Sequence, residues 1–136
     1  MGLVFDDKAL HLLERQRAGQ GVVIKLLRLP GYGLLLEALS IGWCSCKELE
    51  READVVPLGV QRGVPLYADR RVATYARWHA IPVTAWALAW LGGFAVVREI
   101  EVLHDLLNCQ RTHPRLCGVD VTPTRDGSGR YGAPGA

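Results

Sequence analysis

The chain has 136 residues, 49% of them hydrophobic and 22% charged, which is the composition of one folded domain with a substantial core. A net charge of +2 is too small to indicate nucleic acid or an anionic membrane as the partner. The first residues, MGLVFDDKAL, include two aspartates where a signal peptide has a basic start. We therefore expect a cytoplasmic protein whose four cysteines are reduced.

The N-terminal third predicts a helix followed by a β-hairpin. Residues 6–18 have helical apolar spacing, and Asp6 is suited to cap their first turn. Residues 21–29 alternate as a mostly buried strand. The turn PGYG at 30–33 leads into a second strand at 34–42, for which a helix is the alternative. We expect the two strands to pair.

The middle of the chain predicts short elements. Residues 47–54 are a charged helical turn or a loop. Residues 55–59 and 63–69 are strands, and each contains a proline, which confines it to a sheet edge or to a strand start. Residues 69–80 predict a short helix that Asp69 can cap.

The C-terminal third predicts a hairpin, a helix and a tail. Two apolar runs between 81 and 97 flank Gly92 and Gly93, which favours a hairpin over a kinked helix. These runs are too short for a membrane span. Residues 99–113 predict an amphipathic helix, and residues 119–136 are a Gly- and Pro-rich tail after a single domain at 1–118. The apolar stripe of the helix comprises Ile100, Leu103, Leu106 and Leu107.

Residues 54–69 contain the pattern D-V-x-L-G-x-x-x-G-V-P-x-Y-x-D, with one additional residue after Val55. With the opening helix and the hairpin that ends in GGFAVV, this pattern resembles the HesB-like iron–sulfur biosynthesis proteins over residues 6–97. The resemblance implies an α+β fold of short mixed strands with an N-terminal helix, to which this chain adds a C-terminal helix. HesB-type carriers have a cysteine after the first hairpin turn, where this chain has Tyr32, and a C-terminal Cys-Gly-Cys, which it lacks. The family's ligands therefore do not carry over.

Four cysteines form two clusters that can bind metal. Cys44 and Cys46 are one residue apart, and Cys109 and Cys117 flank His113. Four soft ligands in two clusters suit a tetrahedral zinc ion or a small iron–sulfur cluster. The competing interpretation treats the cysteines as small buried apolar side chains, which is the usual state of a free cysteine.

A second resemblance concerns GVPLYADRRVATYARWHAIPVTAWALAWL, which is similar to the latter half of a PIN-type nuclease. It implies that Asp6 or Asp7, Glu48 and Asp69 gather around Mg²⁺ or Mn²⁺ to activate water. The predicted hairpin at 21–42 stands where a PIN domain has helices. This interpretation is therefore the second alternative.

The helix at 69–80 also carries Arg70, Arg71 and Arg77 beside Tyr75 and Trp78. Basic residues interleaved with aromatic ones are typical of surfaces that bind single-stranded nucleic acid. A solvated helix face whose apolar side lies in the core gives the same pattern, and we favour this interpretation.

No motif predicts an enzyme, since neither a nucleophile beside a histidine nor a phosphate-binding loop is present. We expect a non-catalytic binding or assembly protein of HesB-like fold that is linked to iron–sulfur or metal handling. Its expected partner is another protein or a second copy of the chain, with no membrane and no nucleic acid. The alternative is a PIN-type metal-dependent ribonuclease.

Overall fold

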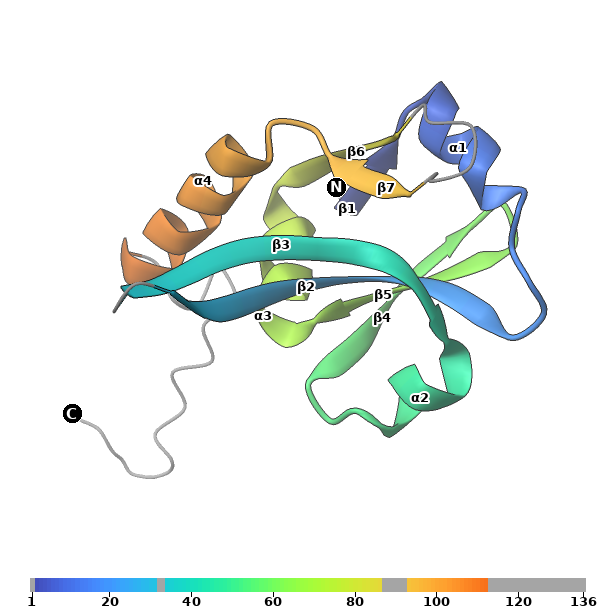
Figure 1. The fold of residues 1–136 in the computed structure, drawn as a ribbon, viewed down its shortest axis with the longest axis horizontal. Helices are drawn as coiled ribbons and strands as arrows, with labels where there is room; N and C mark the ends of the chain where they lie inside the picture. The colour runs from blue at the N-terminus through green and yellow to red at the C-terminus, as the bar shows by residue number, and fades with distance from the viewer. Residues whose placement is uncertain (1, 32–33, 87–92, 113–136) are drawn as a thin grey trace.

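The computed structural model describes residues 2–31, 34–86 and 93–112. They form an α+β domain with two sheets, which confirms the predicted class (Figure 1). In chain order the elements are β1 Gly2–Phe5, α1 Asp7–Leu13, β2 Gln20–Gly31, β3 Leu34–Ser45, α2 Cys46–Arg51, β4 Val55–Gln61, β5 Val64–Asp69, α3 Arg70–Trp78, β6 Ala80–Ala85, β7 Phe94–Val96 and α4 Glu99–Thr112.

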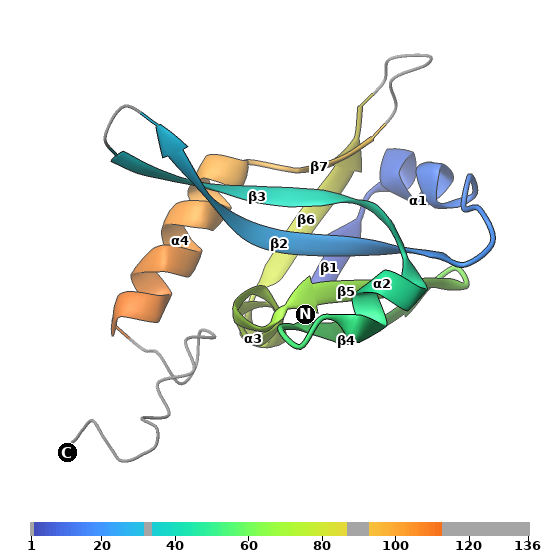
Figure 2. The same cartoon turned by 60° about the horizontal axis from the view of Figure 1, so that its bottom comes forward.

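The two sheets have the strand orders β3-β2-β5-β4 and β1-β6-β7 (Figure 2). The predicted hairpin of β2 and β3 is confirmed. Its antiparallel ladder extends as far as the pair Gln20 and Ser45, so both strands are longer than expected. β2 is parallel to β5, and β1 is parallel to β6. β6 and β7 pair antiparallel, as the predicted hairpin requires, although Gly92 lies outside the described residues.

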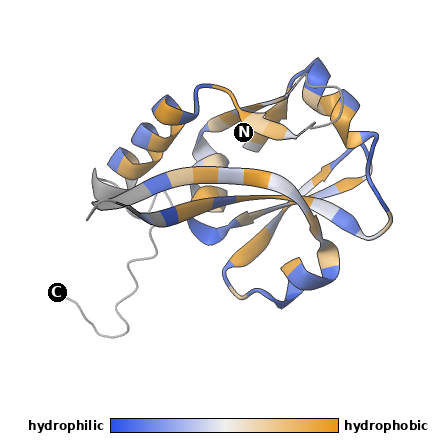
Figure 3. Ribbon diagram, viewed as in Figure 1, coloured by the Kyte–Doolittle hydropathy of each residue, from blue (hydrophilic) through white to orange (hydrophobic). Residues whose placement is uncertain are grey.

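The core lies between the two sheets and is closed by helices. Burial alternates along β2, where Val22, Ile24 and Leu26 point into the core, and most of the strand is apolar (Figure 3). Around Phe94, the rings of Trp43 and Phe5 lie with centroids 5.4 Å and 6.0 Å away. The buried side chains of α1 join this cluster, whereas those of α3 and α4 pack on the other half of the core.

Local signals placed the helix starts correctly. Asp6 accepts a hydrogen bond from the Ala9 N–H at 2.9 Å, and Asp69 accepts one from the Val72 N–H at 2.9 Å, so both predicted caps are confirmed. α1 ends at Leu13 instead of residue 18 because the residues that follow it are polar and exposed, with no apolar face to bury.

The prolines of the middle strands occupy the expected positions. β4 is an edge strand and contains Pro57, and its pairing with β5 is irregular just after this residue. Pro65 is the second residue of β5, before the parallel pairing with β2 begins at Leu66. The ladder between β2 and β5 therefore loses no hydrogen bond to a proline.

One prediction is wrong, and one strand was not predicted. Ile100 does not belong to the apolar stripe of α4, because it is 83% exposed, and Val102 packs against the core in its place. β1 was not predicted, because it is only four residues long and its parallel partner is β6, far along the chain.

The predicted tail at 119–136 lies outside the described residues. Within the described part, no helix is long and apolar enough to cross a membrane.

Asp69 joins three elements of the domain. One carboxylate oxygen caps α3 through Val72, and the other accepts the backbone N–H of Leu26 in β2 at 2.5 Å. The ladder between β2 and β5 ends at the pair Ile24 and Ala68, so the Leu26 N–H has no strand partner on that side. Asp69, which is 8% exposed, satisfies this buried donor and fixes β2, β5 and α3 together.

Replacing Asp69 with asparagine tests this junction. An amide has one acceptor oxygen, so one of the two N–H groups loses its partner, and we expect the free energy of unfolding in urea to fall by about 1–3 kcal/mol. The matched control is Asp6→Asn, because asparagine is as good a helix cap as aspartate and Asp6 is exposed. Equal losses in the two variants would show that Asp69 acts only as a cap.

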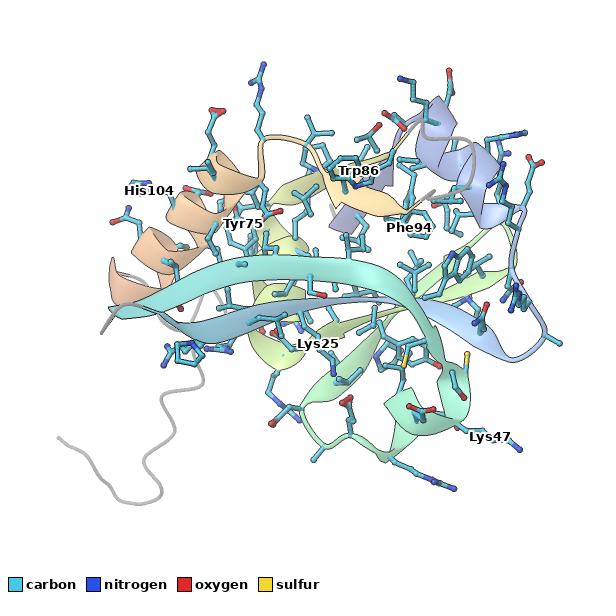
Figure 4. The ribbon with its side chains drawn as sticks, viewed as in Figure 1. Lys25, Lys47, Tyr75, Trp86, Phe94 and His104 are labelled. Atoms are coloured by element: carbon cyan, nitrogen blue, oxygen red, sulfur yellow. The ribbon has the colours of Figure 1, made fainter. Side chains whose placement is uncertain are left out.

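Tyr75 fastens α4 to α3. Its hydroxyl donates a short hydrogen bond to the Asp105 carboxylate of α4, and its ring stacks on His79 with centroids 4.5 Å apart (Figure 4). Burial raises the pKa of Tyr75 well above 10, and the hydrogen bond and negative charge of Asp105 raise it further. The phenol is therefore protonated wherever the domain is folded below strongly alkaline pH.

This pKa shift predicts alkaline instability. The unfolded chain releases the phenol proton near pH 10, whereas the folded protein retains it, so the contribution of Tyr75 is full below pH 10 and is lost as the pH rises through its folded pKa. We expect Tyr75→Phe to reduce the decline in unfolding free energy between about pH 9 and 11, by at most about 1.4 kcal/mol per pH unit. The same slope with and without the hydroxyl would contradict this assignment.

Candidate thiol site

Cys44 and Cys46 lie where β3 ends and α2 begins. Cys44 is paired with Gly21 of β2, and Cys46 is the first residue of α2. The Cys46 N–H donates to the Gly19 carbonyl at 2.8 Å, which fixes the turn between strand and helix. Both cysteines are free thiols and half-buried.

Both thiols lie on the outer face of the four-stranded sheet. Trp43 points into the core against Phe94, so its neighbour Cys44 points to the opposite face. Antiparallel partners share a face, and Gly21 is therefore beside Cys44. The sulfur of Cys46 lies 3.3 Å from the place where a Cβ on Gly21 would stand. The two thiols thus flank one glycine.

Tyr67 of β5 forms the floor of this site. Its Cε1 atom lies 3.1 Å from the same Cβ position on Gly21, so the phenol ring and the Cys46 sulfur meet at this glycine. Burial raises the pKa of Tyr67, and the charge and hydrogen bond of Cys46 and the charge of Glu50 raise it further. The phenol therefore stays protonated beside the Cys46 sulfur.

α2 covers the site from the outside and is held there by two contacts. Leu49 is buried beneath the helix. Lys25 of β2 reaches Glu52, just after the helix, with its Nζ 2.7 Å and 2.8 Å from the two carboxylate oxygens. In Figure 4, Lys25 projects from β2 toward the side that carries α2, and Lys47 projects from α2 into solvent. The backbone that carries Cys46 is therefore anchored at both ends of the helix.

The other predicted metal ligands do not join this pair. Cys109 is in α4, and Figures 1 and 2 show α4 well apart from α2. Cys109 is also disulfide-bonded, so the expectation that all four cysteines are reduced is wrong. Cys117 and His113 lie outside the described residues. Among the residues described, no group of three or more His, Cys, Asp or Glu side chains is placed to hold a metal ion. What this part of the chain assembles is a two-thiol site.

The three carboxylates of the nuclease alternative are also dispersed in the described part of the chain. Asp6 caps α1 and Asp69 caps α3, so backbone N–H groups already occupy both carboxylates. Glu48 belongs to the first turn of α2. No observation on these side chains favours the nuclease chemistry.

No family model, no curated protein and no solved structure matches this chain. The HesB-like and PIN-type resemblances therefore stay predictions.

Sequence reasoning found the two cysteines of the site but missed the roles of Gly21 and Tyr67. Both residues were visible, one as the start of a strand and the other inside the D-V-x-L-G pattern. What brings them together is the parallel pairing of β2 with β5, in which Val23 is opposite Tyr67. No local signal specifies that pairing.

Gly21 is the position at which the site is most sensitive to added volume. A methyl group there would lie 2.8 Å from the Pro65 carbonyl oxygen, which belongs to the backbone and cannot rotate away. We expect Gly21→Ala to lower the unfolding free energy by about 1–3 kcal/mol in urea. The control is Gly42→Ala in the same hairpin, where a Cβ meets nothing within 4 Å and alanine should be neutral or slightly stabilising. A neutral Gly21→Ala would contradict the close packing at the site.

Proposed function

We propose that this chain is a non-catalytic binding and assembly protein that holds a thiophilic metal, as a zinc ion or in iron–sulfur form, at Cys44 and Cys46. The observation that carries the proposal is the placement of two free, half-buried cysteines at Gly21, one as its strand partner and the other with its sulfur against it, beside a buried phenol. Soft thiolate ligands select zinc and iron–sulfur centres over magnesium or calcium.

The number of ligands favours transfer over permanent storage. A structural zinc site is closed by four protein ligands, whereas this pair supplies two. The remaining positions are open to thiols of another protein or of a second copy of the chain. Because both cysteines lie at the edge of α2 and reach solvent, a partner can approach them without unfolding the domain.

Tyr67 would act on a bound metal through its contact with the ligand Cys46. Groups that donate hydrogen bonds to a metal ligand orient it and tune its basicity. Tyr67 lies beside the Cys46 sulfur and, with its pKa raised, keeps its proton over the physiological range. No such interaction involves the Cys44 thiol within the described residues, so Cys46 is the better positioned ligand and Cys44 the more accessible one.

The HesB-like resemblance of residues 54–69 belongs to the same proposal, because Tyr67 is part of its pattern. So does a cytoplasmic location, which would keep the free thiols of Cys44 and Cys46 reduced. The ligands differ from those of the HesB-type carriers, since they stand at the end of β3 and not in a C-terminal Cys-Gly-Cys.

Cobalt titration of the reduced protein tests the proposal. We expect Co²⁺ to give a sulfur-to-metal absorption band, displaced by Zn²⁺, that is lost in Cys44→Ser and in Cys46→Ser. Loss of one of two thiolate ligands should weaken binding at least tenfold. The matched control is Cys109→Ser, which should retain the band because Cys109 is in α4, away from the site.

Two results would contradict the two-thiol site. A band that survives in the double variant Cys44→Ser/Cys46→Ser would place the metal elsewhere. A band that also needs Cys109 would replace the two-thiol site with a site that draws on both cysteine clusters.

A further inference from the structure

The solvent face of α3 combines arginines with a tryptophan. At 3.6 residues per turn, the buried side chains Val72, Tyr75 and Ala76 share one side of the helix. The opposite side is formed by Arg70, Arg71, Thr74, Arg77 and Trp78. We call these five residues the α3 face. In Figures 1 and 2 the helix stands between α4 and the β4–β5 hairpin.

Helix stability does not explain this arrangement. Arg70 and Arg71 occupy the first turn, at the positive end of the helix dipole, where acidic residues are favoured and cations cost about 0.3–1 kcal/mol each. The first turn has no acidic residue, and the helix sequence RRVATYARW has none at all. Arg70 and Arg71 therefore stand against the local preference of the helix, whereas Arg77 in the last turn agrees with it.

The guanidinium groups of the α3 face have few partners within the described part of the domain. Within the described residues, Arg71 and Arg77 form no ion pair and no hydrogen bond, and Arg70 donates only to the Ala53 carbonyl at 3.2 Å. Some arginines elsewhere on the domain are paired, since Arg28 contacts Glu37 and Arg62 contacts Glu14. The donors of the α3 face remain available to an anion.

Trp78 completes the face with an open aromatic surface. It is 52% exposed in the last turn of α3, next to Arg77, one turn beyond Thr74 and two turns beyond Arg71. An exposed indole beside cationic side chains offers a flat surface for stacking within a field that attracts negative charge.

We propose that the α3 face binds single-stranded nucleic acid, with the arginines on phosphates and Trp78 stacked on an unpaired base. Charge complementarity requires an anionic partner, and the exposed ring favours one that carries flat bases over an acidic protein. A duplex hides its base faces in the stack, so a single strand fits better. Because α3 is about 13 Å long, the contact spans only a few nucleotides. This activity goes beyond the proposed metal function and needs neither cysteine.

Fluorescence anisotropy with labelled single-stranded oligouridine and oligothymidine tests the proposal on the full chain. We expect Trp78→Ala to weaken binding by about 5-fold to 150-fold, as loss of one stacked base predicts. The matched control is Trp86→Ala, because Trp86 is equally open, at 61% exposure, but stands at the end of β6. Its affinity should remain that of the unchanged protein.

Salt dependence isolates the arginines. Three phosphate contacts predict a slope of about −2 in log K against log salt, and Arg71→Gln/Arg77→Gln should reduce its magnitude by about 1.4. Arg51→Gln, an exposed arginine of α2, is the control and should leave the slope unchanged. All the substituted side chains are exposed or half-buried, and urea unfolding of each variant checks that the fold is kept.

Three results would overturn the inference. These are no binding by the unchanged protein, equal losses in Trp78→Ala and Trp86→Ala, or equal competition by polyglutamate, which would identify an acidic protein as the partner. Cys44→Ser/Cys46→Ser should bind the oligonucleotide normally. The cobalt titration and the oligonucleotide binding assay therefore test the metal function and this inference independently.

Discussion

The carboxylate of Asp69 is the contact on which the rest of the arrangement depends. It accepts one N–H from β2 and one from the first turn of α3, so the end of the β2–β5 ladder and the start of the helix are fixed by one side chain. The parallel register that it secures places Tyr67 opposite Val23 on the outer face, next to Gly21. The same junction sets where α3 begins, and hence which of its residues face solvent. Both candidate sites follow from this register.

At the thiol site, Gly21 is as important as the thiols and the phenol because it has no side chain. Gly21 leaves the volume into which the Cys46 sulfur and the Tyr67 ring converge. The buried phenol supplies a hydrogen-bond donor that holds its proton, and the Lys25–Glu52 pair anchors α2 over the sheet. A pair of soft ligands with one oriented member and one accessible member is suited to a metal that is passed between proteins.

Local signals in the sequence predicted much of this fold. The caps at Asp6 and Asp69, the long hairpin and α4 depend on residues close in sequence, and all were found. β1 was missed because a four-residue parallel strand acquires its pairing only from β6. Ile100 was misassigned because helical periodicity does not say which flank of a helix meets its neighbours. Likewise, the cysteine pair was readable, but its contact with Tyr67 arises from pairing of distant strands.

The measurement that tests the account most directly is zinc-edge X-ray absorption on the reduced, zinc-loaded full chain. The account predicts sulfur neighbours at about 2.3 Å, fewer of them in Cys46→Ser, and an altered sulfur shell in Tyr67→Phe, which lacks the hydroxyl beside Cys46. A first shell of nitrogen and oxygen only, unchanged by Cys46→Ser, would contradict the claim that Cys44 and Cys46 bind the metal.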